Sequence, residues 1–143
     1  MKWKIISVGK PSFPWVREGC ETYHKRLQPF VSVEMIQLKK SDPGLFLKAS
    51  GSALTLALDE RGKGFTTGAF AGEVKGWELD SVKEVAVWIG GSDGLPSELR
   101  KQADRCFSLG SQTLMHELAL LVWMEQLYRV YTLNADHPYH RES

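Results

Sequence analysis

Short apolar runs alternate with segments of helical periodicity along the whole chain. Continuous apolar runs such as residues 85–89 (VAVWI), and segments in which apolar and polar positions alternate, are typical of strands. We predict strands at residues 3–8, 31–38, 53–58, 85–89 and 106–109. We predict helices at 14–28, 66–77 and 113–133, a helix that starts at 96–97, and a short helix or turn at 42–50. This alternation is typical of an α/β fold with a mainly parallel sheet flanked by helices.

Two polar, glycine-containing loops are expected on one edge of that sheet. Residues 59–64 and 90–94 each follow a predicted strand. Because ligands of such folds bind outside the carboxyl ends of the strands, we expect the ligand site between these loops.

The size of the chain and its cysteines narrow the class of protein. The 143 residues (16.1 kDa) correspond to one domain, residues 1–143. The longest apolar run, 118–124, is shorter than the ~20 residues of a membrane span, and residues 1–10 lack a signal-peptide pattern. Cys20 and Cys106 are too far apart to indicate a zinc-thiolate motif or a disulfide framework. We therefore expect a soluble, cytoplasmic protein without a membrane partner.

Charge is unevenly distributed along the chain. The net charge is +1, yet residues 1–40 hold eight Lys and Arg against three acids. The weak net charge is unlike that of avid binders of naked nucleic acid, but the basic first third suits a local phosphate surface. Alternatively, Arg17, Glu21 and Lys25 pair along a solvated helix at i, i+4 spacing.

The glycine loop 90–94 (GGSDG) allows two interpretations. Glycine lets the backbone approach a ligand closely, although the loop lacks the spacing of a dinucleotide fingerprint. It also spells G-x-S-x-G, which would make Ser92 the nucleophile of a small serine hydrolase. In hydrolases with this pattern, the serine lies on a tight turn, the nucleophile elbow, and a helix begins directly after it. The next predicted helix of this chain begins several residues later, so the hydrolase is the alternative.

Histidines raise the question of a metal site. His137 and His140 lie near the C-terminus, and His116 could add a third imidazole. His116-Glu117 is followed at position 120 by Leu120, so the metalloprotease helix motif is absent. We expect no metal.

The predicted long helix carries apolar residues almost all round. Glu125 and Arg129 are four residues apart and are expected to pair. A helix with this much apolar surface is usually covered on more than one side, so we expect a second subunit to cover it.

Several motifs in a fixed order resemble one known family. They are IISVGK (5–10), Y-x-KRL (23–27), ALD (57–59) before GK (62–63), IGGS-x-GL (89–95), FSL (107–109), T-x-x-H (113–116), EQLYR (125–129) and the ending YHR (139–141). Together they resemble the ribosomal RNA large subunit methyltransferase H family, a minimal branch of the SPOUT methyltransferases, over essentially the whole chain.

The resemblance implies a fold and an activity. The fold would be of SPOUT type, with a trefoil knot near the C-terminus that holds S-adenosylmethionine. The protein would be a homodimer with active sites at the subunit interface. It would methylate N3 of a pseudouridine in large-subunit (23S) ribosomal RNA on the assembled ribosome, without a metal. A non-catalytic ribosome-binding module is a further alternative.

The resemblance also assigns residues. Cofactor contacts fall on Leu58, Gly90, Leu109, Gly110, Ser111, Gln112, Thr113 and Leu114, and the catalytic group on His116, Arg129, Tyr139, His140 and Arg141. His140 would act as the base, Arg129 or Arg141 would stabilise the developing anion, and Tyr139 would stack on or hydrogen-bond to the nucleobase. Met115 and Leu120 stand where many relatives have Pro and Arg. The polar tail, residues 134–143, has few apolar residues, so we expect it to become ordered only with RNA.

Overall fold

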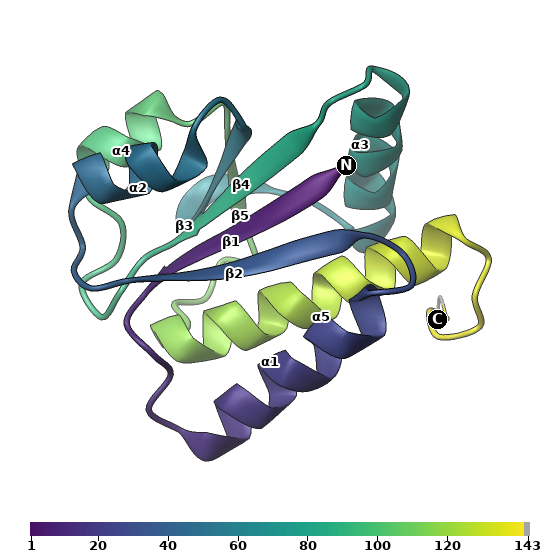
Figure 1. The fold of residues 1–143 in the computed structure, drawn as a ribbon, viewed down its shortest axis with the longest axis horizontal. Helices are drawn as coiled ribbons and strands as arrows, with labels where there is room; N and C mark the ends of the chain where they lie inside the picture. The colour runs from purple at the N-terminus through teal and green to yellow at the C-terminus, as the bar shows by residue number, and fades with distance from the viewer. Residues whose placement is uncertain (142–143) are drawn as a thin grey trace.

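Five parallel strands form a sheet between two layers of helices (Figure 1). The computed structural model describes residues 1–141. The strands are β1 (Lys2–Val8), β2 (Ser32–Leu38), β3 (Leu54–Gly64), β4 (Glu84–Ile89) and β5 (Arg105–Ser108), in the order β2-β1-β4-β3-β5. All four pairings are parallel, so the predicted parallel α/β sheet is confirmed.

The helices divide between the two faces of the sheet. They are α1 (Pro14–Leu27), α2 (Pro43–Ser50), α3 (Thr67–Leu79), α4 (Ser97–Gln102) and α5 (His116–Asn134). Helices α1, α3 and α5 pack on one face, and α2 and α4 pack on the other. The Thr66 hydroxyl accepts a hydrogen bond from the Ala69 N–H, as expected for a helix cap.

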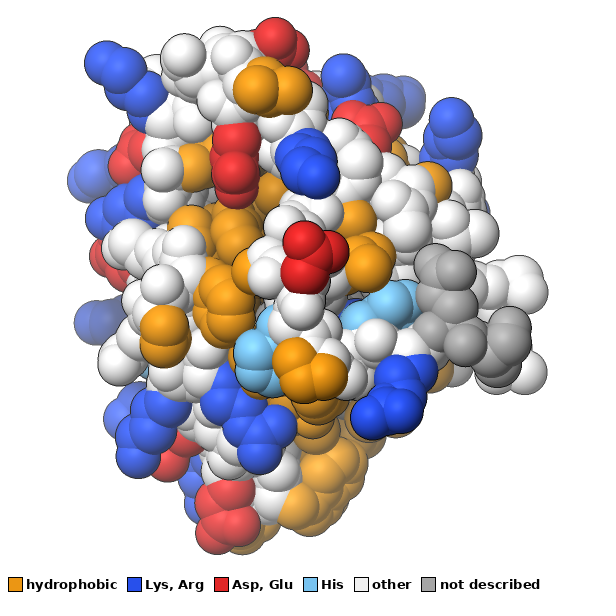
Figure 2. Space-filling view, turned by 90° about the vertical axis from the view of Figure 1, so that its right-hand side faces the viewer, with side chains coloured by type: hydrophobic (Ala, Val, Ile, Leu, Met, Phe, Trp, Pro, Cys, Tyr) orange, Lys and Arg blue, Asp and Glu red, His pale blue; other side chains and the backbone are white. Residues whose placement is uncertain are grey.

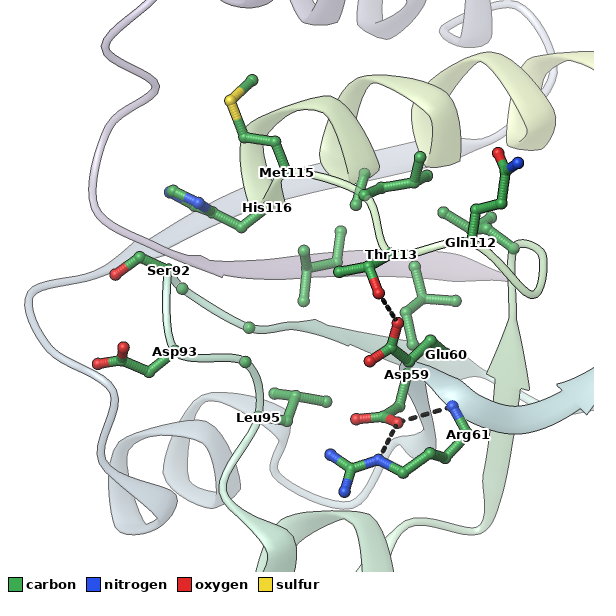
Figure 3. Close-up of a pocket in the computed structure, with 18 of the residues that line it drawn as sticks. Asp59, Glu60, Arg61, Ser92, Asp93, Leu95, Gln112, Thr113, Met115 and His116 are labelled. Atoms are coloured by element: carbon green, nitrogen blue, oxygen red, sulfur yellow. Dashed lines mark hydrogen bonds and ion pairs between the residues drawn. The ribbon is translucent and has the colours of Figure 1, made fainter.

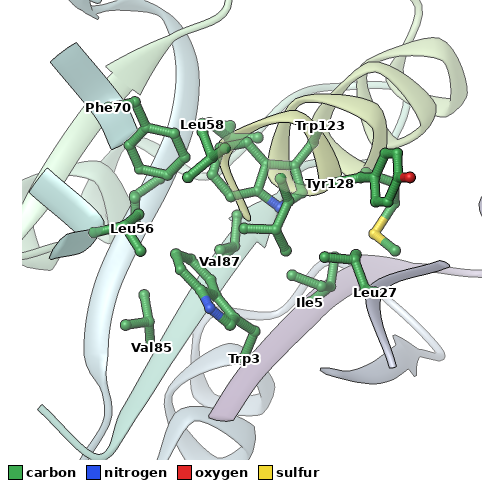
Figure 4. Close-up of a cluster of buried hydrophobic side chains, with 14 of the residues drawn as sticks. Trp3, Ile5, Leu27, Leu56, Leu58, Phe70, Val85, Val87, Trp123 and Tyr128 are labelled. Carbon is green, nitrogen blue, oxygen red and sulfur yellow. The ribbon is translucent and has the colours of Figure 1, made fainter. Parts of the chain in front are cut away.

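The larger core lies under α1, α3 and α5 (Figure 4). Alternation along β1 sends Trp3 and Ile5 to this face and Ile6 to the other. The Trp3 indole is fully buried, and its N–H donates to the Tyr131 hydroxyl at 2.7 Å. The Trp123 ring lies 6.1 Å from the Trp3 ring, so aromatic packing holds the middle of α5 on the sheet.

Strand β3 continues through the segment predicted as a polar loop. It pairs with β4 as far as Leu58, and its last two residues, Lys63 and Gly64, pair with β5. The intervening residues form a bulge, and a Cβ on Gly62 would lie 2.7 Å from the Cys106 carbonyl oxygen. The loop prediction for 59–64 is therefore wrong, because a bulge puts polar residues inside a strand.

Helix α5 begins at His116, inside the segment 113–133 that was predicted to contain the longest helix. Glu117 in its first turn accepts hydrogen bonds from the Ser12 hydroxyl at 2.7 Å and the Phe13 N–H at 3.2 Å. Arg17 donates to the Pro11 carbonyl at 2.8 Å, and no ion pair joins it to Glu21 in the described chain, so that predicted pairing is wrong.

The tail folds back onto α5. The Tyr139 ring lies 4.6 Å from the Tyr128 ring, and the His137 N–H donates to the Thr132 carbonyl at 2.8 Å. The expectation of a tail without fixed contacts is wrong for these residues, because a single tyrosine ring anchors it. Among the helices described, none is long and apolar enough to cross a membrane. The knot stays a prediction from the resemblance.

The contacts of Glu117 generate a test of stability against pH. Burial opposes ionisation, but hydrogen bonds from Ser12 and Phe13 hold the pKa of the Glu117 carboxyl below its ordinary value of 4.5. The ionised Glu117 carboxylate therefore stabilises the fold fully above about pH 4.5. This stabilisation is lost as the pH falls through the lower pKa that Glu117 has in the folded state. Glu117→Gln should lower Tm by several degrees at pH 7, with a difference that shrinks below about pH 4.5.

Thermal unfolding followed by circular dichroism at several pH values measures this effect. The exposed Glu73 of α3 provides the control, because Glu73→Gln should leave Tm unchanged at every pH. A Glu117→Gln difference that is the same at acidic and neutral pH would contradict the assignment.

Candidate active site

A cavity of about 660 Å³ opens at the carboxyl ends of β3, β4 and β5, beside the start of α5 (Figure 3). Its walls come from the bulge of β3, the turn after β4, the segment before α5 and the first turn of α5. The volume is that of a small-molecule site, and the cavity lies between the two loops from which the sequence predicted a ligand site.

Most of the predicted cofactor residues line this cavity. They are Leu58, Gly90, Leu109, Gly110, Gln112, Thr113 and Leu114, and His116 of the predicted catalytic group lines it as well. Ser111 is exposed and lies outside the lining, so its assignment is not supported by the geometry. The resemblance did not assign the bulge residues Asp59, Glu60 and Arg61 or the turn residues Asp93 and Leu95, although loops 59–64 and 90–94 were expected to flank the ligand site.

The glycine loop is a tight backbone turn. The Gly94 N–H donates to the Gly91 carbonyl at 2.9 Å, and Gly94 has a φ of 78°, a conformation that favours glycine. A Cβ on Gly90 would lie 2.5 Å from the Gly94 carbonyl carbon, so Gly90 also needs to be glycine.

The turn does not form the nucleophile elbow of the hydrolase alternative. Ser92 is exposed at the turn, and α4 begins only at Ser97. No hydrogen bond joins Ser92 to His116 in the part of the chain described (Figure 3). The hydrolase is not favoured.

Charged side chains close one side of the cavity (Figure 3). Glu60 accepts a hydrogen bond from the Thr113 hydroxyl, which joins the β3 bulge to the segment before α5. Asp59 accepts from the Arg61 Nε at 3.1 Å and lies 3.4 Å from the Arg100 Nε of α4. The sequence predicted these acids in a loop beside the ligand site, and only the structure shows that they belong to a bulged strand.

The remaining predicted catalytic residues gather at the other end of α5. Arg129 donates through Nε and Nη2 to Glu125 Oε1, at 2.9 and 2.6 Å, which confirms the predicted pair. Its guanidinium carbon lies 4.9 Å from the Tyr139 ring centroid, and Nη1 lies 3.3 Å from His140 Nδ1. Arg141 is exposed. We call Glu125, Arg129, Tyr139 and His140 the arginine–tyrosine cluster.

The protonation of this cluster follows from its contacts. Hydrogen bonding to Glu125 raises the pKa of the Arg129 guanidinium, which stays cationic. Burial and the nearby Tyr23 and Glu125 raise the pKa of the Tyr139 hydroxyl well above its ordinary value of 10, so Tyr139 is a neutral donor. Because a guanidinium only donates, His140 Nδ1 is the acceptor in the Arg129 contact.

Helix α5 separates this cluster from the cavity. His116 lines the cavity, and Arg129 follows thirteen residues later on the same helix. At 1.5 Å per residue, about 20 Å of helix lies between them. One chain alone therefore does not bring the two predicted groups together.

Apolar side chains are exposed around the start of α5. Phe13 and Trp15 are 40% and 49% exposed, with ring centroids 5.4 Å apart, and Met115 is 41% exposed. On the side of the molecule where α5 ends, Lys and Arg side chains lie beside His and apolar atoms (Figure 2). No group of three or more His, Cys, Asp or Glu side chains in residues 1–141 could hold a metal.

Comparison with known proteins defines the class of this site. Residues 1–140 match a family model described as predicted SPOUT methyltransferase. A tRNA methyltransferase from Aquifex aeolicus has a similar fold, with a TM-score of 0.59 and 14% identity, over 100% of this chain and 76% of that chain. The chain has the fold of a SPOUT methyltransferase, a class whose methyl donor is S-adenosylmethionine.

Closer relatives identify the family. A "Ribosomal RNA large subunit methyltransferase H" from Thermus thermophilus is 41% identical over 141 residues, 99% of each chain. A protein of the same name from Deinococcus radiodurans is 37% identical over 145 residues, again 99% of each chain. This chain belongs to the ribosomal RNA large subunit methyltransferase H family, as its motifs predicted.

One departure from the family pattern has a structural explanation. Leu120, which stands where many relatives were expected to have Arg, is 4% exposed and packs in the larger core. Met115 precedes α5 directly and lines the cavity.

The geometry of the glycine turn generates a binding prediction. In Gly90→Ala, the new Cβ would push the 91–94 turn away from Gly90 and reshape the cavity wall. We expect at least a tenfold loss of S-adenosylmethionine affinity in calorimetric titration. The control is Gly72→Ala in α3, where the Cβ meets nothing within 4 Å. Equal affinity in both variants and in the unmodified protein would show that the turn does not shape the binding site.

Proposed function

We propose that this chain transfers a methyl group from S-adenosylmethionine to large-subunit ribosomal RNA. The target is N3 of a pseudouridine on the assembled ribosome, in the cytoplasm. The observation that carries the proposal is the full-length likeness to methyltransferases of that name, together with a cavity lined by seven of the eight expected cofactor residues.

The chemistry of the cavity fits this cofactor. S-adenosylmethionine supplies an electrophilic methyl group on a positively charged sulfur. Backbone groups at Gly90 and along the 109–114 segment offer hydrogen-bonding partners for its adenosine and methionine parts. Glu60 and Asp93 in the lining complement its positive charges.

The protein acts as a homodimer with a composite active site. The arginine–tyrosine cluster is about 20 Å along α5 from the cavity of its own chain, so it serves the cavity of the partner. The exposed Phe13 and Trp15 and the partly exposed outer residues of α5, such as Leu118 and Val122, form the contact surface. A two-fold axis that sets the two α5 helices antiparallel places each cluster next to the other cavity.

The cluster supplies the proton transfer and the charge stabilisation. The N3–H of the target base must lose its proton before N3 attacks the methyl carbon, and His140 Nδ1 takes that proton. The Arg129 Nη1, which contacts Nδ1 in the isolated subunit, donates to the base and stabilises its developing anion. Tyr139 stacks on the base as a neutral ring, and the exposed Arg141 contacts phosphate.

Mixed dimers test the reaction and the composite site together. Ribosomes that lack the modification are incubated with labelled S-adenosylmethionine, and the methylated nucleotide is identified by mass spectrometry. His140→Ala and Gly90→Trp should each reduce methylation at least ~100-fold as pure dimers. If both subunits fold and mix freely, half of the dimers are mixed and each has one intact site, so about a quarter of the activity should return.

Two results would contradict the proposal. Mixtures that stay inactive would place each cluster at the cavity of its own chain. Binding of the ribosome without methylation by the unmodified protein would favour the non-catalytic ribosome-binding module.

The contact surface gives a separate prediction on assembly. Trp15→Glu should convert the dimer to a monomer, because it places a charge in an apolar contact, whereas Leu79→Glu on α3 should leave the dimer intact. Leu79 is 82% exposed and provides a matched control. Light scattering after size-exclusion chromatography measures both masses. A monomeric unmodified protein at micromolar concentration would rule out the dimer.

A further inference from the structure

Glu125 is the centre of the arginine–tyrosine cluster. Its Oε1 accepts hydrogen bonds from Arg129 Nε and Nη2 and from the Tyr139 hydroxyl, the last at 3.1 Å. Its Oε2 accepts from Gln126 Nε2 at 2.8 Å, and Gln126 Oε1 in turn accepts from the Thr67 hydroxyl of α3. One carboxylate therefore joins a helix residue, the tail and a neighbouring helix.

We propose that Glu125 is a positioning residue for methyl transfer. It holds the Arg129 guanidinium and the Tyr139 ring in the orientation in which they meet the nucleobase. The inference rests on the proposed function, since it names a residue that acts through the proposed catalytic group.

The geometry explains why both groups need this carboxylate. An arginine side chain has several rotatable bonds, but two donors bound to one carboxylate oxygen restrict its fork to one orientation. Tyr139 belongs to the tail, which would otherwise rely on the ring contact with Tyr128 and a few backbone bonds. Arg129 and Tyr139 also lie 4.9 Å apart, so releasing either one disturbs the other.

Glu125 is not part of the core that holds α5 on the sheet. Its side chain is 21% exposed, whereas the neighbouring Trp123 and Leu127 are completely buried and hold α5 on the core. Glu125 is nine residues from His116, about 14 Å along the helix, so its replacement leaves the cavity wall in place. A loss of activity without loss of fold or cofactor binding is therefore the expected signature.

Steady-state methylation of ribosomes by Glu125→Gln tests this role. The amide keeps the size of the side chain but loses the charge that holds the guanidinium. We expect kcat to fall at least tenfold, because misalignment of reacting groups is costly, while KM for the ribosome and S-adenosylmethionine affinity stay within twofold. Tm should stay within about 2 °C, since the pair is partly exposed. Glu73→Gln on α3 is the matched control and should match the unmodified protein throughout.

A double-mutant cycle separates positioning from a general structural effect. If Glu125 acts through Arg129, Glu125→Gln should cause little further loss in an Arg129→Ala background, whereas independent effects would multiply. Tyr139→Phe removes only the hydroxyl that reaches Glu125, so it should lower kcat less than Glu125→Gln does. This variant also tests the contact if Glu125→Gln fails to fold.

Each outcome bears on a different statement. If the unmodified protein methylates ribosomes and Glu125→Gln does so equally well, or if the losses of Glu125→Gln and Arg129→Ala multiply, the positioning role is wrong and the proposed function stands. If Glu125→Gln does not fold, full activity of Tyr139→Phe overturns the role. If the unmodified protein does not methylate ribosomes, the proposed function fails and this inference fails with it.

Discussion

The burial of Trp123 against Trp3 and Phe70 is the packing on which the rest of the molecule depends. The Trp123 ring lies 6.1 and 5.2 Å from those two rings, and all three side chains are at most 1% exposed. This contact holds the middle of α5 on the sheet, while Glu117 ties its first turn to the loop before α1. One rigid helix therefore carries part of the cavity wall at one end and the arginine–tyrosine cluster at the other, and their separation cannot change without unpacking the core.

The cavity depends on backbone more than on side chains. Gly62 passes against the Cys106 and Phe107 backbone, and Gly90 passes against the Gly94 backbone, at distances that exclude any Cβ. These approaches let the β3 bulge and the 91–94 turn form the wall of the cavity with backbone groups. The proposed catalytic side chains lie elsewhere, in a cluster in which Glu125 accepts hydrogen bonds from Arg129 and Tyr139. In the proposed function, cofactor binding and base recognition are therefore separate tasks of the two ends of α5.

Much of this architecture was predictable, because it follows from the spacing of apolar and charged residues that are close in the sequence. The apolar spacing located all five strands, and the interval between Glu125 and Arg129 predicted their ion pair. The position of the cavity also followed, since parallel strands end on one edge. Three predictions failed. Residues 59–64 belong to a bulged strand, no ion pair joins Arg17 to Glu21 among the described residues, and Tyr139 anchors the tail.

The amino-acid sequence by itself determined the class of fold and the family, and it named seven residues that line the cavity, because periodicity and motif order are properties of neighbouring positions. Only the tertiary structure decided that Asp59 and Glu60 line the cavity as part of a bulged strand, since pairing with β5, more than forty positions later, creates the bulge. It also decided that His116 and Arg129 lie at opposite ends of one helix. A sequence motif identifies which residues belong to a site. The distance between those residues is set by the packing of their helix against the core, which the motif does not describe.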